Sequence, residues 1–345
     1  MNRRALIVGL SGAEITDDEV AYLKDVRPMG LILFKRNCVG REQIIKLLSD
    51  ARSAIGGDET LTLIDQEGGR VQRLLPPLGR RLPPAAAYGQ LYKSGQKKRA
   101  CEAAFSVSRL LAQDLRELGI NTNCAPVLDL PVPGAHDIIG DRAYSTSVDE
   151  IVALGRSVAL GFMAGGVLPV IKHIPGHGRA NKDSHLDLPV VHTSRDELSR
   201  TDFATFAALS DIPAAMTAHV VFSSIDAKAP ASTSKKIIQD VVRGEIGYDG
   251  LLMSDDLGMH ALTGSMKDRA EAVIKAGCDI VLHCSGTMSE MKDAALGSPE
   301  LSGKPLERAN QAFAVTEKKV HFNISEAEEY LSQVIAAYSK SSESV

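Results

Sequence analysis

Short apolar runs alternate with segments of helical periodicity along almost the whole chain of 345 residues. The runs cover residues 5–9, 30–34, 60–64, 121–126, 167–171, 214–218, 250–253 and 279–283. This alternation is typical of a parallel α/β fold, because each buried strand is followed by a helix that covers the sheet. About eight strands is the number that closes a (β/α)8 barrel of the TIM type. We therefore predict a single α/β barrel domain over residues 1–338 and a polar tail at residues 339–345.

Several helix starts are marked by a hydroxyl residue with a glutamate at the third position after it. In such a capping box, the hydroxyl and the carboxylate accept hydrogen bonds from backbone N–H groups that the first helical turn leaves unpaired. The pairs are Thr16 with Glu19, Ser147 with Glu150, and Ser194 with Glu197. We expect a helix to begin at each pair and the last helix to cover residues 325–338.

Polar residues stand where many of the predicted strands end. They occur in the segments DQEGGRVQR from Asp65, VLDL from Val127, KHIPGHG from Lys172, His219 alone, and SDDLGM from Ser254. Each has a structural interpretation: the acidic residues could cap turns or helices, and the histidine could be a satisfied core residue. Since all strand ends of a barrel meet on its C-terminal face, their combination favours an active or binding site there.

The chain after the predicted strand at 167–171 combines loop-forming residues with acid/base side chains. A proline and two glycines within residues 175–178 prevent a regular helix, so we expect residues 174–187 to form a loop. The titratable side chains at the strand end and in this loop include Lys172, His173, His177, Asp183 and His185. A simple connection does not need so many such groups. We interpret it as an active-site loop.

Composition and charge exclude several functional classes. The formal net charge of −4 gives no electrostatic reason to expect nucleic acid or an anionic membrane as a partner. The only N-terminal apolar run, residues 5–10, is too short for a signal peptide or a membrane span. The 5 cysteines are scattered without a CxxC pair, which indicates neither a disulfide framework nor a structural zinc site. We expect a cytoplasmic protein with reduced thiols.

The absence of several catalytic and nucleotide-binding motifs excludes further classes of reaction. The sequence has no dinucleotide fingerprint after a strand, no P-loop and no GxSxG elbow, which argues against nucleotide phosphate binding and against an α/β serine hydrolase. His173 and His177 would share one face only on a helix, which Pro175 prevents, so a metal-dependent hydrolase is disfavoured but stays open. A barrel that binds amino sugars without catalysis is a second alternative. Acid/base catalysis with a carboxylate nucleophile, as in a retaining glycoside hydrolase, is the remaining scheme.

Six motifs, in order along the chain, carry a resemblance. They are DQEGGRVQRL from Asp65, GDRAYS from Gly140, KHIPGHG from Lys172, DSHLDLP from Asp183, MTAHV from Met216 and MSDDLGM from Met253. This set resembles the single-domain bacterial β-N-acetylglucosaminidases of glycoside hydrolase family three. The chain departs from that family at Tyr144 and Ile174, where phenylalanine is commoner.

The resemblance implies roles for individual residues. It makes Asp255 the nucleophile and His185 the acid/base, assisted by Asp183. The residues implied in binding the sugar are Asp65, Arg73, Arg142, Lys172 and His173. It further implies removal of terminal β-linked N-acetylglucosamine from muropeptide fragments with anhydro-muramic acid during cell-wall recycling, without cofactor, metal or obligate protein partner. The residues alone do not decide between Asp255 and Asp256.

Overall fold

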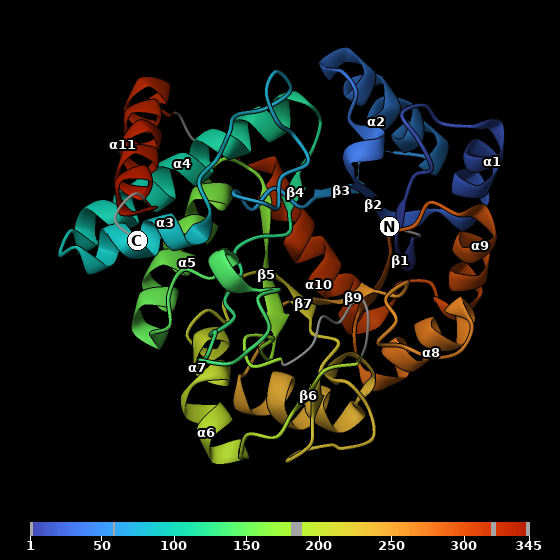
Figure 1. The fold of residues 1–345 in the computed structure, drawn as a ribbon. Helices are drawn as coiled ribbons and strands as arrows, with labels where there is room; N and C mark the ends of the chain where they lie inside the picture. Colours follow the sequence, from blue (N-terminus) through green and yellow to red (C-terminus); the bar gives the residue numbers. More distant parts are fainter. Residues whose placement is uncertain (1–2, 58, 181–187, 319–321, 343–345) are drawn as a thin grey trace.

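The computed structural model describes residues 3–57, 59–180, 188–318 and 322–342. Within these residues, eight parallel strands close into a barrel in the order β1-β10-β9-β7-β5-β4-β3-β2 (Figure 1). They are β1 Arg4–Gly9, β2 Pro28–Leu33, β3 Leu61–Ile64, β4 Thr122–Asn123, β5 Leu168–Ile174, β7 Ala214–Thr217, β9 Leu251–Asp256 and β10 Ile280–His283. Each predicted strand has its counterpart, and the predicted (β/α)8 barrel is confirmed.

Helices follow the strands and surround the barrel (Figure 1). The α-helices are α1 Asp17–Val26, α2 Arg41–Ile55, α3 Ala85–Lys93, α4 Lys97–Glu117, α5 Val148–Ala164, α6 Arg195–Arg200, α7 Asp202–Ala207, α8 Met266–Ala276, α9 Met288–Gly297, α10 Gly303–Ala314 and α11 Ile324–Ser342. A π-helix, Ile237–Glu245, precedes β9. Among the described residues, no helix is both long enough and apolar enough to cross a membrane.

The barrel wall separates two apolar layers, because successive side chains of a strand point to opposite faces. Ile7, Leu63 and Val170 belong to the cluster that fills the barrel, whereas Leu6 and Val8 pack in the layer between strands and helices. The interior cluster extends to α10 through residues such as Ala309 and Ala312, and Arg308 of the same helix binds Asp279 just before β10 at 2.9 Å. Helix α10 therefore closes the N-terminal end and leaves the C-terminal end for a site.

Two strands, β5 and β9, continue further at their C-terminal ends than the sequence indicated. β5 continues through Ile174, which pairs with Thr217 of β7, so Lys172 and His173 lie within the strand rather than after it. β9 continues to Asp256, which pairs with Leu282 of β10. Both extensions occur because a neighbouring parallel strand offers backbone partners to residues whose polar side chains suggested a loop.

The predicted helix starts have mixed outcomes. The Thr16 capping box forms, with the Thr16 hydroxyl accepting from Glu19 N at 3.2 Å and Glu19 accepting from Thr16 N at 2.9 Å. The Ser194 hydroxyl caps α6, but the Glu197 carboxylate pairs with Arg179. The Ser147 box does not form.

At the start of α5 the Glu150 carboxylate accepts a hydrogen bond from the Ser145 hydroxyl at 2.5 Å instead of returning to Ser147. Helix α11 ends at Ser342, beyond the predicted end at residue 338. A small parallel sheet of β6 Val190–Val191 and β8 Val221–Phe222 was not predicted. Runs of two residues are too short for a recognisable pattern.

Candidate active site

A cavity of about 390 Å³ lies among residues at the C-terminal ends of the barrel strands. Its polar lining comes from β5, from β9 and from the segments that follow β3, β4 and β5: Asp65, Glu67, Arg70, Arg73, Arg142, Lys172, His173, His177, Asp255 and Asp256. Apolar side chains such as Phe34 and Met259 complete the wall. This volume lies near the lower end of the range for small-molecule sites, about 300–1,000 Å³. It suits a small polar ligand.

The chain after β3 turns back on itself and brings Arg73 to Asp65. Gly68 has a φ of 107°, a conformation that side chains with Cβ rarely adopt, and a Cβ there would overlap the Pro83 carbonyl oxygen. Gln66 secures the turn, since its Oε1 accepts from the backbone N–H groups of Arg73 and Leu74 at 2.8 and 3.0 Å. The glycines of the DQEGG motif are therefore required by this tight return.

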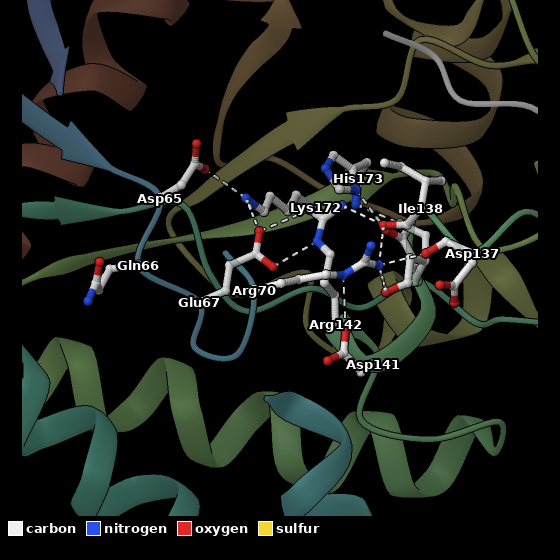
Figure 2. Close-up of polar contacts among 12 residues, drawn as sticks. Asp65, Gln66, Glu67, Arg70, Asp137, Ile138, Asp141, Arg142, Lys172 and His173 are labelled. Carbon is white, nitrogen blue, oxygen red and sulfur yellow. Dashed lines mark hydrogen bonds and ion pairs between the residues drawn. The ribbon is translucent and has the colours of Figure 1, made fainter. Parts of the chain in front are cut away.

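Two carboxylates and three cations form a connected cluster on one wall of the cavity (Figure 2 shows all but Arg73). Lys172 Nζ lies 3.0 Å from Asp65 Oδ1 and 2.7 Å from Glu67 Oε1. The Arg142 guanidinium binds Glu67 through two contacts of 2.9 Å, and Arg73 Nη2 lies 2.8 Å from Asp65 Oδ2. Each carboxylate thus contacts two cations, as buried charges require.

The pKa values of this cluster follow from its pairing. Burial alone would raise the pKa of Glu67, but Arg142 and Lys172 overcome this and lower it to about 2. The pKa of Asp65 is likewise held below its ordinary value by Lys172 and Arg73 against the effect of burial. Burial would lower the pKa of Lys172, yet the two carboxylates raise it. All these groups are charged at neutral pH, and the three cations outnumber the two carboxylates.

A buried aspartate positions the histidines of β5 and the following loop. Asp129 has no exposed surface, and its Oδ2 lies 2.7 Å from His173 Nδ1. Its Oδ1 accepts from the backbone N–H groups of His173 at 3.2 Å and His177 at 2.7 Å. The two imidazole rings lie 5.6 Å apart. Burial and the neighbouring His173 lower the pKa of His177 to about 4, so His177 is neutral at physiological pH.

The two aspartates at the end of β9 have different surroundings. Asp256 Oδ1 accepts from the backbone N–H groups of Gly258 at 3.0 Å and Cys284 at 2.9 Å, which ties it to the end of β10. Asp255 Oδ1 accepts from the Asp256 N–H at 2.8 Å, and the Asp255 charge acts on the nearby His177 and His219. The contacts of Asp256 therefore hold it to the backbone of the following turn and of the end of β10.

His219 is hydrogen-bonded to the backbone at the end of β9. The residue is fully buried, and its Nε2 lies 3.0 Å from the backbone carbonyl oxygen of Asp256 while Nδ1 lies 2.6 Å from Ser232 Oγ. Burial lowers the pKa of His219, so its ring is neutral. Its Nε2–H donates a hydrogen bond to the Asp256 carbonyl oxygen, and its Nδ1 accepts a hydrogen bond from the Ser232 hydroxyl. The structural interpretation considered for this histidine is the one that its contacts favour.

Six of the predicted site residues line the same cavity: Asp65, Arg73, Arg142, Lys172, His173 and Asp255. Asp183 and His185 lie outside the described residues. Within the described part of the chain, no three histidine, cysteine or acidic side chains are grouped so that they could hold a metal ion. The structure does not test the roles that the resemblance implies.

Two residues of the site were not predicted from the sequence. Glu67, which had no predicted site role, is the central carboxylate between Lys172 and Arg142. Asp129, likewise without a predicted role, orients His173. The sequence contained a signal for both residues, because Glu67 stands two positions after Asp65 and Asp129 lies in the polar segment that follows β4.

Comparison with known proteins places the chain in a family. Residues 6–309 match the Glycosyl hydrolase family 3 N terminal domain. A Beta-hexosaminidase of Psychromonas ingrahamii is 38% identical over 287 residues, which are 82% of this chain and 83% of that protein. A Beta-hexosaminidase of Alkalilimnicola ehrlichii is 39% identical over 284 residues, 81% of this chain and 80% of that protein.

A solved structure agrees with the sequence relatives. NagZ from Neisseria gonorrhoeae, in complex with N-trifluoroacetyl-D-glucosamine, superimposes with a TM-score of 0.86 and 32% sequence identity. The match covers 97% of this chain and 98% of that one. With the barrel and the paired carboxylates and cations at its C-terminal face, these likenesses show that the chain belongs to glycoside hydrolase family 3 and is a glycoside hydrolase.

Proposed function

We propose that this enzyme is a retaining exo-β-N-acetylglucosaminidase. The observation that carries the proposal is a single cavity in which Asp255 of β9 lies together with the Asp65, Glu67, Lys172 and Arg142 cluster. The relatives named Beta-hexosaminidase support it, as does the neighbour that binds N-trifluoroacetyl-D-glucosamine.

The cluster offers the hydrogen-bonding groups that a sugar needs. Asp65 is ionised and accepts hydrogen bonds from sugar hydroxyls. Arg73, Arg142 and Lys172 carry N–H donors for hydroxyl oxygens and for the acetamido oxygen. We assign His173, held by Asp129, to the same function. The cavity volume of about 390 Å³ favours one terminal sugar unit over the interior of a polymer.

We assign the first chemical step to Asp255. Its carboxylate oxygen forms a bond to the anomeric carbon while the glycosidic C–O bond breaks, and His185 gives its proton to the leaving oxygen. In the second step a water molecule attacks the anomeric carbon, His185 takes the water proton, and the ester bond to Asp255 breaks. Asp183 keeps the His185 imidazole oriented and stabilises its charged form. An imidazole near its ordinary pKa of about 6.5 can both donate and accept at neutral pH.

We also propose a place for this reaction. The substrates are small amino-sugar compounds, most specifically muropeptide fragments with anhydro-muramic acid that arise in cell-wall recycling in the cytoplasm. Residues 1–338 form the catalytic domain, and turnover needs neither metal nor cofactor nor an obligate protein partner. This role rests on the resemblance to single-domain family members and is tested with such fragments as substrates.

A chromogenic aryl β-N-acetylglucosaminide, assayed with and without a chelator, tests the activity. Release of the aryl group that is unaffected by the chelator is the expected result. Release that stops on chelation and returns with zinc would support the metal-dependent hydrolase instead. Binding of N-acetylglucosamine without any release would identify a non-catalytic sugar-binding barrel.

A further inference from the structure

A second, smaller cavity shares the lining residue Glu67 with the first one. It has a volume of about 20 Å³, and its other polar lining residues are Tyr88 of α3, Ser108 of α4 and Tyr144. These three residues are each at most 7% exposed, and the remaining lining residues are apolar. The cavity is therefore a buried site with polar groups next to Glu67. Figure 2 shows the contacts of Glu67 with Lys172 and Arg142.

The hydroxyl groups of this cavity have no hydrogen-bond partner within the described part of the chain. Among the described residues, Tyr88, Ser108 and Tyr144 form no side-chain hydrogen bond, although the rings of Tyr88 and Tyr144 lie only 6.5 Å apart. Burial and the neighbouring Tyr88 and Glu67 raise the pKa of Tyr144 well above its ordinary value, so its hydroxyl keeps its proton and can donate. Buried hydroxyls are normally satisfied by protein or by ordered water.

Glu67 has capacity for one more hydrogen bond. An ionised carboxylate offers about four acceptor positions. Within the described residues, its oxygens accept Arg142 Nε and Nη2 at 2.9 Å each and Lys172 Nζ at 2.7 Å. These three contacts leave about one acceptor position of Glu67, and Glu67 lines the small cavity.

We propose that the small cavity binds one ordered water molecule that donates a hydrogen bond to Glu67 and accepts one from the Tyr144 hydroxyl, with Tyr88 and Ser108 as further partners. About 10–15 Å³ suffices for one water, which typically makes about three hydrogen bonds to buried polar groups. The cavity provides both the volume and the partners. The water holds the Glu67 carboxylate in its orientation, and the carboxylate in turn positions Arg142 and Lys172. Tyr144 and Tyr88 are thus positioning residues that act through the water.

The kinetic effect rests on the proposed function, in which Arg142 and Lys172 bind the sugar. Removing one hydroxyl costs about one hydrogen bond, which corresponds to about a fivefold change in an equilibrium constant. We assign to these cations contacts of equal strength in the ground state and the transition state, so Tyr144→Phe should raise KM about fivefold with little change in kcat. Tyr88→Phe should do the same to a smaller extent.

The test combines crystallography with kinetics of Tyr144→Phe, Tyr88→Phe and the double variant. The control is Tyr92→Phe, since Tyr92 also lies on α3 but lines neither cavity. The expected structure has ordered water density within hydrogen-bond distance of Glu67 and Tyr144. The double variant should exceed the larger single effect only slightly, because both hydroxyls serve one water.

Three outcomes would overturn the inference. They are a dry cavity in a structure that resolves other buried waters, a Tyr144 hydroxyl bonded directly to Glu67, or a KM for Tyr144→Phe equal to that of Tyr92→Phe. The crystallographic result does not depend on turnover. If the water is present but aryl N-acetylglucosaminides are not cleaved, the proposed function fails while the water site stands.

Discussion

Replacing Glu67 by glutamine should destabilise the protein in a pH-dependent way. The Glu67 side chain is 6% exposed, and it contacts Lys172 and Arg142, which are 3% and 11% exposed. Glutamine keeps the shape of the side chain but leaves both cations without their shared counter-charge. Breaking a buried ion pair on one side costs about 3–5 kcal/mol, because the remaining charge stays buried.

The pKa of Glu67 gives a second value for the stability that its charge contributes. It falls from an ordinary value of 4.5 to about 2 in the folded protein. At about 1.4 kcal/mol for each pKa unit, this difference corresponds to about 3 kcal/mol of stability. The carboxylate binds a proton less readily in the folded state, so the contribution is complete above pH 4.5 and is lost as the pH falls toward 2. About 2 kcal/mol of it is gone at pH 3.

Urea unfolding at pH 7, 5, 4 and 3 measures the difference in free energy of unfolding between the wild type and Glu67→Gln. We expect the wild type to be more stable by about 3 kcal/mol at pH 7, and we expect the gap to shrink by about 2 kcal/mol at pH 3. Glu42→Gln on α2 is the matched control, since Glu42 is exposed and its replacement should change stability by less than about 0.5 kcal/mol at any pH. A Glu67→Gln gap that does not change with pH would refute the coupling of Glu67 to its two cations.

Three further predictions concern the aspartates of β9, the proposed acid/base pair and the need for a metal ion. Asp256→Ala should lower the free energy of unfolding by about 1–3 kcal/mol, because it leaves the N–H groups of Gly258 and Cys284 without their acceptor, whereas Asp255→Ala should abolish turnover with an unchanged circular dichroism melting temperature. His185→Ala should reduce kcat by about 10²–10⁴-fold, and adding Asp183→Ala should reduce it little further; a double variant with the full product of both losses would separate the two residues. Exhaustive chelation should leave the rate unchanged, and a loss restored by zinc would contradict this.

The fold was predictable because its signal is repeated along the chain. Most strands show an apolar run, with helical segments between these runs, whereas β4 is only the two polar residues Thr122–Asn123. Strand ends were less predictable, since Lys172 and Asp255 have polar side chains yet lie within strands that their neighbours extend. A failed capping box shows the same limit: Ser145 competes with Ser147 for Glu150, and only the three-dimensional arrangement decides between them.

The site was predictable in its members but not in its connections. Residue types at strand ends indicated Asp65 and Lys172, and the family motifs added Arg73 and Arg142. Glu67 joins Lys172 to Arg142 through contacts with residues that lie 105 and 75 positions further along the chain. No local sequence pattern encodes such contacts. The choice between Asp255 and Asp256 likewise required the backbone donors that hold Asp256.

The central claim is that Asp255 is the nucleophile. It is tested most directly by mass spectrometry of the enzyme after reaction with a slow fluorinated N-acetylglucosaminide, followed by proteolysis to locate the label. We predict a glycosyl ester on Asp255, because Asp256 is held by Gly258 and Cys284. Label on Asp256 would contradict the assignment, and turnover of the reagent without any label would indicate attack by the substrate's own acetamido group instead.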